Sequence, residues 1–377
     1  MAVGALALIV VLSVFNGFEG LVLSLYNSFY PDIEIRAAQG KTFEESDSLK
    51  AKILQLSEVD FVSRTLEETA YFEYGESAQL GTVKGVDENY NSVTLVKEYV
   101  RTGNFLLRDS DFNYAVIGAN IAIPMSINVE RGMEPLRITV PRKGVKKAFL
   151  PEDAFSSMQA LPAGIFSIQQ EFDSKYVFVS LDFARELIGA DNQITSYELK
   201  LKNENDIEAV KEKLTASLGN NYFVRTRYEQ KAETYRVMKI ERWVTTAILS
   251  FIILIISFNI IGSLSMLVLE KSKDISILKA MGADAFQIRK IYLLNGMLAS
   301  LIGAGIGLAL GYTICLLQMK FHFLRLGGDD TSFVINYYPV KLKLLDPLIT
   351  LFVIVSVSLF ASYFPAKRAS ESKMSFK

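Results

Sequence analysis

Four long stretches without a charged side chain constrain the fold of this sequence more than any other feature. Residues 243–269, 291–319 and 347–366 contain no Asp, Glu, Lys or Arg, and residues 1–18 are uncharged up to Glu19. A helix needs about 20 predominantly apolar residues to cross about 30 Å of hydrocarbon, and all four stretches are long enough to span. Uncharged runs of this length are rare in water-soluble folds, so the sequence predicts a membrane protein with four transmembrane α-helices.

The first stretch has an alternative interpretation as a secretory signal peptide. It has no basic region at its start, and no A-x-A-like cleavage site stands where the polar chain begins. These features favour a genuine transmembrane helix. Because nothing precedes the apolar run, we expect the natural start codon to lie upstream.

Basic residues near the spans indicate which side faces the cytoplasm. The segment 270–290 and the tail carry more Lys and Arg than the short loop 320–346, although basic residues just before the second span weaken the comparison. By the positive-inside rule, the segment and the tail are cytoplasmic and the long segment 28–236 faces outward. The predicted order is transmembrane helix 1 at 1–27, an exported domain at 28–236, transmembrane helix 2 at 237–269, a cytoplasmic link at 270–290, transmembrane helix 3 at 291–319, an outer loop at 320–346, transmembrane helix 4 at 347–366 and a cytoplasmic tail at 367–377.

Composition removes several classes of function. A formal net charge of −1 provides no overall field for nucleic acid. The single cysteine and the single histidine leave too few ligands for a His/Cys metal site, and composition leaves open only a site made of carboxylates. Gly40-Lys41-Thr42 resembles the end of a phosphate-binding loop, but Ile35 stands where that motif requires glycine. We therefore predict no catalytic residues, no metal and no cofactor in this chain, and we expect another chain to hydrolyse ATP.

The exported domain reads as mixed α/β. Residues 32–36 alternate as a strand, a helical pattern follows them, and 61–74 and 79–86 read as strands. A strand, helix and strand recur over 197–226. This order predicts a split βαβ, porter-like subdomain interrupted by a β-rich insert at about residues 90–194.

Two local patterns allow both an ordinary and a functional interpretation. Residues 159–164 read as a projecting turn between strands, which by itself is an ordinary loop. Gly303, Gly307 and Gly311 form a smooth stripe on the third span, where small residues let helices approach closely, although glycine is also simply common in membrane helices.

The cytoplasmic link contains a short amphipathic helix. Its apolar residues recur at steps of three and four. Such a helix lies on the lipid surface or docks on a cytoplasmic partner, and the pattern alone leaves both open. The apolar residues are Ile275, Leu278, Met281, Ala285 and Ile288.

Four segments, in order along the whole chain, resemble the lipoprotein-releasing system transmembrane subunits of the LolC/LolE type, within the FtsX/MacB-like ABC permease superfamily. The stretch from Asp274 to Gly282 is typical of the wider superfamily, and the stretch from Ser13 to Glu19 is more specific to lipoprotein release. The segments are VVLSVFNGFE at 10–19, PDIEI at 31–35, EK at 270–271 with DISILKAMGA at 274–283, and YFPAKRA at 363–369.

The resemblance implies a multi-pass permease of the bacterial inner membrane with its large domain in the periplasm. It implies a homo- or heterodimer of permease subunits, a separate LolD-like ATPase that binds ATP and Mg²⁺, lipoprotein substrates and a LolA-like periplasmic carrier. Leu161, Pro162, Ala163 and Gly164 match the position of a loop that hooks the carrier. The residues that match the ATPase-coupling helix are Asp274, Ile275, Ser276, Ile277, Leu278, Lys279, Ala280, Met281 and Gly282.

Lipoprotein release would also require a hydrophobic cavity that holds the acyl chains during transfer. At about 0.8 kcal/mol per buried CH₂, moving three acyl chains fully into water costs on the order of tens of kcal/mol. We expect the cavity between the first two spans, although ordinary helix packing accounts equally well for the residues concerned. The candidate cavity residues are Phe15, Asn16, Phe18, Val22, Ile255 and Phe258.

Two departures and two rival functions accompany the resemblance. The chain lacks the short cytoplasmic segment before the first span, and residues 370–377 lack the usual Pro-containing, Leu-Arg-rich ending. The rivals are a MacB-like efflux permease, whose ATPase is normally fused to the same chain, and an FtsX-like mechanotransmission protein that regulates a cell-wall hydrolase. The exported domain of the second rival is usually smaller than residues 28–236.

Overall fold

A computed structural model describes residues 1–109, 112–129, 134–142, 154–325 and 337–371. The chain divides into two compact units. The helical unit comprises Met1–Val22 and Glu233–Lys377, and the α/β unit comprises Leu23–Ala232. Parts of the predicted outer loop and of the predicted tail, at 326–336 and 372–377, lie outside the described residues.

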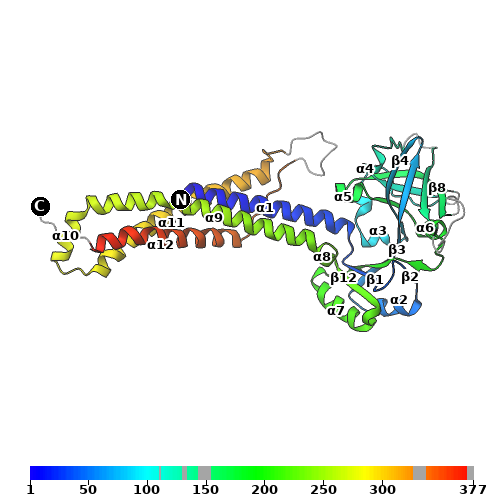
Figure 1. The fold of residues 1–377 in the computed structure, drawn as a ribbon, viewed down its shortest axis with the longest axis horizontal. Helices are drawn as coiled ribbons and strands as arrows, with labels where there is room; N and C mark the ends of the chain where they lie inside the picture. The colour runs from blue at the N-terminus through cyan, green and yellow to red at the C-terminus, as the bar shows by residue number, and fades with distance from the viewer. Residues whose placement is uncertain (110–111, 130–133, 143–153, 326–336, 372–377) are drawn as a thin grey trace. The chain divides into compact units, whose positions relative to one another are not determined.

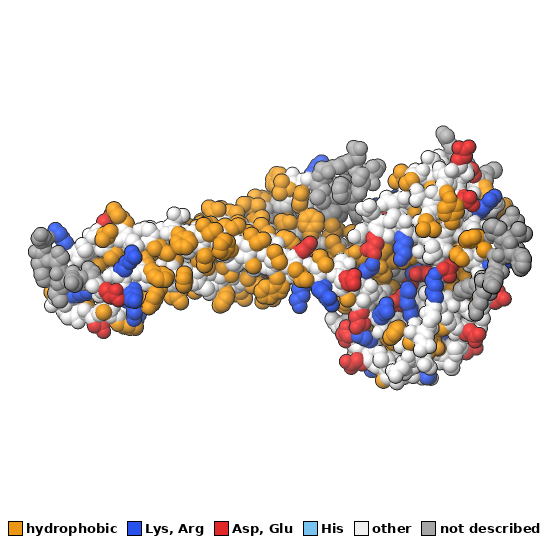
Figure 2. Space-filling model, in the orientation of Figure 1, with side chains coloured by type: hydrophobic (Ala, Val, Ile, Leu, Met, Phe, Trp, Pro, Cys, Tyr) orange, Lys and Arg blue, Asp and Glu red, His pale blue; other side chains and the backbone are white. Residues whose placement is uncertain are grey.

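Four helices in the described residues are long and apolar enough to cross a membrane, which confirms the predicted fold class (Figure 1). Figure 2 shows hydrophobic side chains over most of the visible face of the helical unit, with charged side chains gathered near its α10 end. The four helices are α1 (Ala2–Phe29), α9 (Ala232–Glu270), α11 (Ala285–Phe321) and α12 (Leu345–Glu371).

Few apolar side chains of the helical unit face its interior. One buried cluster joins Ala5, Leu8 and Leu12 of α1 to one residue from each of the other three long helices. Large apolar side chains such as Trp243 point outward instead, and Trp243 is 70% exposed. Burial inside the unit therefore supplies little of the hydrophobic effect, and lipid must cover the remaining surface. The other members of the cluster are Ile253, Ala304 and Ile354.

The glycine stripe of α11 lies against the first half of α1. A Cβ atom built at Gly307 would overlap the backbone oxygen of Ala2 and crowd Ala5. One built at Gly311 would overlap the side chain of Ile9. Close backbone approach thus replaces the side-chain packing that a larger residue would need.

The short helix α10 (Ser272–Ala280) joins α9 to α11. Its inner side packs through Ile275, which is buried with Ile288 of α11 and Ala366 of α12. Gly282 then takes a positive φ of 99°, a conformation that favours glycine, and Asp284 begins α11 with a capping box. These contacts fix α10 to the ends of two long helices.

The described part of the α/β unit contains a ten-stranded mixed sheet. The order is β12-β1-β11-β3-β4-β9-β6-β8-β5, and β7 pairs with both β3 and β8. The strands are β1 (Ile33–Ala37), β3 (Val59–Tyr74), β4 (Ser77–Val86), β5 (Val100–Gly103), β6 (Tyr114–Gly118), β7 (Leu136–Pro141), β8 (Phe155–Phe166), β9 (Tyr176–Ser180), β11 (Ser196–Leu201) and β12 (Tyr222–Thr226), with β2 (Phe43–Glu44) and β10 (Gln193–Ile194) paired separately. The helices are α2 (Asp47–Leu54), α3 (Tyr90–Val93), α4 (Ala119–Ala122), α5 (Gln170–Asp173), α6 (Leu181–Ile188), α7 (Ile207–Leu218) and α8 (Arg227–Gln230).

The sixteen-residue strand β3 connects two hydrophobic cores. Its first half pairs with β11, beside a core formed with α2 and α7, and its second half pairs with β4 and β7, beside a core that includes α6. The predicted insert at 90–194 accordingly shares one sheet with the subdomain that surrounds it. The second core also takes Leu66, Phe72 and Val83 from outside the predicted insert.

The prediction of a projecting turn at residues 159–164 is wrong. Leu161, Pro162, Ala163 and Gly164 lie inside β8, between β6 and β5, and Pro162 and Gly164 are buried. Pro162 lies where the pairing between β8 and β6 shifts register. Such an irregularity tolerates proline, which has no N–H to donate to a neighbouring strand. Gly164 is required by the close approach of the Asn104 carbonyl oxygen, so both turn-forming residues serve strand packing.

The close contact at Gly307 predicts that Gly307→Leu separates α11 from α1, whereas Gly305→Leu does not. A Cβ at Gly305 has no atom within 4 Å. We expect Gly307→Leu to lose about 1–3 kcal/mol of stability through overpacking. Thermal unfolding of the two full-length variants in detergent measures the difference, and equal midpoints would contradict the packing assignment.

Candidate functional site

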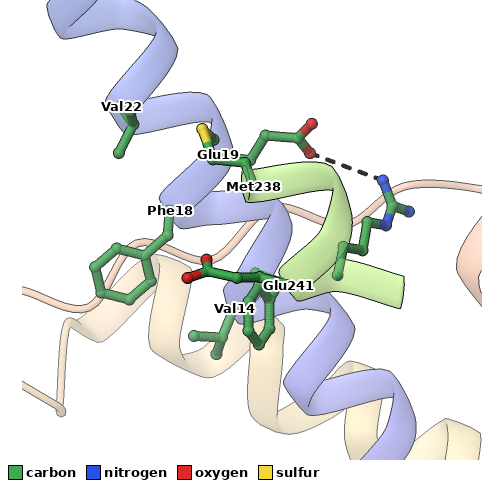
Figure 3. Close-up of a pocket in the computed structure, with 8 residues that line it drawn as sticks. Val14, Phe18, Glu19, Val22, Met238 and Glu241 are labelled. Atoms are coloured by element: carbon green, nitrogen blue, oxygen red, sulfur yellow. Dashed lines mark ion pairs between the residues drawn. The ribbon is translucent and has the colours of Figure 1, made fainter. Parts of the chain in front are cut away.

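A cavity of about 380 Å³ lies in the helical unit between α1 and α9 (Figure 3). Its volume is within the usual range of small-molecule sites. Most of its wall is aliphatic or aromatic, and its charged groups are two carboxylates and one guanidinium. It is lined by Val14, Phe15, Phe18, Glu19 and Val22 of α1 and by Met238, Glu241 and Arg242 of α9.

The α1 wall follows from helical spacing. Val14, Phe18 and Val22 recur every four residues and therefore share one face of the helix, and Phe15 lies beside them. All four side chains are half-buried. The Phe18 ring also meets Tyr338 edge to face, with 5.8 Å between the ring centroids. An apolar ligand could thus reach rings and branched side chains already held in place.

A network of charged and polar side chains joins three helices beside this cavity. The Asp346 carboxylate is fully buried and accepts hydrogen bonds from Asn16 Nδ2 at 2.5 Å and from Arg242 Nη2 at 3.3 Å. Arg242 also pairs with Glu19 at 3.8 Å, and Lys343 Nζ donates to Glu19 at 2.8 Å. Asp346 stands in the first turn of α12, where the helix dipole favours a negative charge. The network thereby fixes α1 to α9 and to the start of α12.

Backbone contacts explain the small residues in this part of α1. Lys341 N donates to the Ser13 carbonyl oxygen at 2.9 Å. A Cβ atom at Gly17 would overlap the backbone of Pro339 and Val340. The segment before α12 therefore lies directly on α1, and only glycine fits at position 17.

The structure separates the predicted cavity residues into two groups. Phe15, Phe18 and Val22 line the cavity, whereas Asn16 is 1% exposed and binds Asp346. Ile255 and Phe258 lie further along α9, are 51% and 61% exposed, and do not line it.

The sequence analysis also missed five residues of the cavity wall. The four-residue spacing with Phe18 and Val22 was a signal for Val14. In the sequence, Glu19 stands out only as the end of an apolar run and of the family-like stretch at 10–19, and Arg242 only as one of the basic residues before the second span. The missed residues are Val14, Glu19, Met238, Glu241 and Arg242.

The helix α10 presents an apolar outer surface. Ile277, Leu278 and Met281 are 55%, 38% and 79% exposed, whereas Ile275 and Ser276 face inward. Lys279 Nζ donates to the Ser370 carbonyl oxygen at 2.9 Å, which adds a polar contact to α12. The helix is thus fixed on one side and open on the other.

The remaining predicted coupling residues have local roles. Asp274 forms an ion pair with Lys271, and Ala280 ends the helix.

A buried charge cluster in the α/β unit was not predicted. Lys84 of β4 is 3% exposed and pairs with Glu198 at 2.7 Å and with Glu67 at 3.1 Å. Its ammonium group also lies over the rings of Phe29 and Tyr90, at 5.4 and 5.3 Å from their centroids. Alternating strand residues placed these charges on an inward face, and no motif in the sequence marks them.

The environment sets the ionisation of the three charged groups. Burial opposes the charge of Lys84, but Glu198 and the other neighbours outweigh it and hold the lysine pKa well above its ordinary value. Burial also opposes ionisation of Glu67, yet attraction from Lys84 and Arg36 brings the Glu67 pKa below its usual range. For Glu198 burial dominates and raises the pKa. Within the described residues, no group of three or more His, Cys, Asp or Glu side chains is arranged to hold a metal ion.

The Lys84 cluster predicts a strong effect of removing its cation. Lys84→Met removes the cation that pairs with Glu198 and leaves Glu67 with only its 3.7 Å ion pair to Arg36. Breaking a buried pair typically costs about 3–5 kcal/mol. We expect the backbone amides of β4 and β11 to exchange hydrogen faster in this variant than in the wild-type full-length protein. Hydrogen–deuterium exchange measured by mass spectrometry tests this. Lys175→Met, which removes an exposed lysine, is the control. Adding Glu198→Gln to Lys84→Met should restore part of the protection, and unchanged exchange in Lys84→Met would contradict the prediction.

Comparison with known proteins supports the resemblance seen in the sequence. Residues 246–374 match the FtsX-like permease C-terminal family. The chain is 24% identical to LolC of Buchnera aphidicola subsp. Schizaphis graminum, over 99% of this chain and 90% of that protein. It is 25% identical to LolE of Haemophilus influenzae, over 98% of this chain and 90% of that protein. Both relatives are described as lipoprotein-releasing system transmembrane proteins.

One solved structure is similar to part of the chain. The periplasmic region of MacB from Actinobacillus actinomycetemcomitans aligns with a TM-score of 0.39 and 12% identity, over 56% of this chain and 94% of that one. The sequence comparisons confirm the similarity to LolC and LolE over nearly the whole chain and to the FtsX-like permease C-terminal family over residues 246–374, and the four candidate spans agree with a membrane protein.

Proposed function

We propose that this protein is an ABC permease, the transmembrane subunit of a lipoprotein-releasing complex in a bacterial inner membrane. The complex would extract lipoproteins from the outer leaflet and pass them to a periplasmic LolA-like carrier. Similarity to LolC and LolE over nearly the whole chain is the observation that carries the proposal. The α/β unit, which follows the first span, would be the periplasmic domain.

The cavity between α1 and α9 would receive the acyl chains. Its rings and aliphatic side chains match hydrocarbon, and Phe15, Phe18 and Val22 supply much of the wall. Passive transfer of acyl chains through water costs on the order of tens of kcal/mol, so release requires both an apolar shelter and an energy source. The network around Asp346 would hold the two walls together until that energy arrives.

The energy would come from a separate LolD-like ATPase that binds ATP and Mg²⁺. Gly40-Lys41-Thr42 lacks the first glycine of a phosphate-binding loop, and Gly40 with its φ of 86° fits a simple turn. The exposed Ile277 and Leu278 of α10, with Met281 directly after the helix, suit a docking surface on the cytoplasmic side. Because Ile275 packs on α11 and α12, a push on α10 would move both helices.

Two further partners belong to the proposal. A second permease subunit, identical or related, would face the cavity and complete the site. The carrier would bind the periplasmic domain. Leu161, Pro162, Ala163 and Gly164 stay predicted carrier contacts, but as part of β8 they would act through a sheet surface rather than through a projecting hook.

Docking through α10 predicts that Met281→Asp, alone or with Leu278→Asp, weakens capture of the ATPase. A charge replaces an apolar contact at the centre of the proposed interface, and we expect roughly tenfold less co-purified ATPase. Leu344→Asp is the matched control because Leu344 is 89% exposed outside α10. Undiminished co-purification with both α10 substitutions would refute the docking role.

Lipoprotein release predicts that depletion of this protein strands lipoproteins in the inner membrane. Membrane fractionation followed by quantification of lipoproteins in each fraction tests this outcome. Normal amounts in the outer membrane would reject the transport function. A cell-division or wall-hydrolysis defect with normal lipoprotein sorting would favour the FtsX-like alternative, and drug sensitivity with normal sorting would favour the MacB-like one.

A further inference from the structure

Two buried glutamates of the α/β unit lie directly opposite each other on neighbouring strands. Glu34 of β1 and Glu198 of β11 are partners in the antiparallel register, and they are only 6% and 1% exposed. Like charges in such a cross-strand pair destabilise the pairing of the strands. Burial strengthens the repulsion because little water is present to screen it.

The cations beside this pair do not balance the negative charge. Arg36 pairs with Glu34 at 2.7 Å and with Glu67 at 3.7 Å. Lys84 pairs with Glu198 at 2.7 Å and with Glu67 at 3.1 Å. Two cations therefore face three carboxyl groups, and one negative charge is left over if all three are ionised.

In the described residues, the other ionisable side chains around the Lys84 cluster do not supply the missing positive charge. Asp32 and Lys200, the next ionisable residues on β1 and β11, pair with each other at 3.4 Å. Lys175 is exposed and lies over the Tyr176 ring, at 4.8 Å from its centroid. Tyr90 and Tyr176 stay neutral because burial raises the pKa of both phenols.

One oxygen atom of Glu198 also lacks a hydrogen-bond donor. Its Oε1 accepts from Lys84 Nζ at 2.7 Å and from Thr65 Oγ1 at 3.4 Å. Its Oε2 is buried and has no hydrogen-bond partner within the described part of the chain. An ionised carboxylate is costly in such a place, whereas a protonated carboxyl group is neutral and needs fewer donors.

We infer that Glu198 binds a proton in the folded protein, and that this proton makes the pairing of β1 with β11 dependent on pH. With the proton bound, two negative charges remain in the cluster, and Arg36 and Lys84 neutralise them. Without it, Glu34 and Glu198 repel each other across the two strands. Because β1 follows the end of α1 within a few residues, a rise in pH loosens the first strand after the first span.

The direction of the pH dependence follows from the environment of Glu198. Burial raises its pKa, and repulsion from Glu34 adds to this effect, against the attraction of Lys84. The bound proton therefore stabilises the folded unit fully below the ordinary pKa of glutamate, and this contribution is lost as the pH rises through the raised pKa. Between the two values, the equilibrium constant for opening this part of the sheet rises by up to about tenfold per pH unit.

Infrared spectroscopy of the full-length protein in detergent detects the proton through the C=O stretch of a protonated carboxyl group. The difference between the wild type and Glu198→Gln isolates the Glu198 band, and a second buried carboxyl with a raised pKa, that of Asp173, cancels in it. The reference is Glu76→Gln, which isolates an exposed glutamate in the turn between β3 and β4. We expect the Glu198 band to persist to a higher pH than the Glu76 band. Equal midpoints overturn the inference.

A second variant tests the role of the opposing charge. In a Glu34→Gln background, the Glu198 band is isolated by comparison with the double variant Glu34→Gln/Glu198→Gln. We expect this band to disappear about one pH unit lower than in the wild type, which is the lower end of the usual effect of a neighbouring charge. An unchanged midpoint overturns the assignment of the proton to this carboxyl pair.

Hydrogen–deuterium exchange tests the effect on the strands. Glutamine copies the neutral form of the side chain, so Glu198→Gln should fold and keep β1 and β11 protected as the pH rises. Comparison with the wild type at each pH removes the intrinsic pH dependence of exchange. We expect the wild-type amides of both strands to exchange progressively faster than those of the variant, by up to about tenfold per pH unit. A ratio that does not change with pH overturns the proposed control of strand pairing.

Discussion

The buried carboxylate of Asp346 is the interaction on which the arrangement of the helical unit depends. An ionised group hidden from water persists only when it is paired and hydrogen-bonded, and here Asn16 and Arg242 provide both. Because these partners come from α1 and α9, the charge of one side chain fixes three helices at the cavity. Any change in the distance between α1 and α9 must rearrange this network, so cavity shape and ion pairing are coupled.

Apolar contacts alone would not fix that geometry. Helices in lipid gain little from hiding one hydrocarbon surface against another, and they associate through close packing and polar contacts. This chain uses both, at different points along the first helix: the glycines of α11 contact the first turns of α1, and the Asp346 network holds its middle turns. The 39-residue helix α9, about 58 Å long by its rise per residue, then runs from the cavity wall to the base of α10.

The α/β unit follows a different principle. Its strands form one sheet in which β3 belongs to both hydrophobic cores, so the two halves cannot turn independently without breaking β3. The cluster around Lys84 adds a buried charge that is costly to separate from its partners. Both features favour a domain that behaves as one rigid body.

The sequence by itself determined the four spans, the α/β class and the strands around β1, β3, β4, β11 and β12. The length of an uncharged stretch, and the hydrophobic periods of 2 residues in strands and 3.6 residues in helices, are properties of the local sequence. They can be recognised without knowing which residues are neighbours in space. Only the tertiary structure decided that Leu161 to Gly164 lie within a strand, because the pairing with β6 and β5 is long-range and overrides the turn preference of Pro and Gly. It also decided that Glu19 is paired, since the two cations that bind it are more than 200 residues away from it along the chain. Charge compensation depends on distance in space, and the order of residues does not record it.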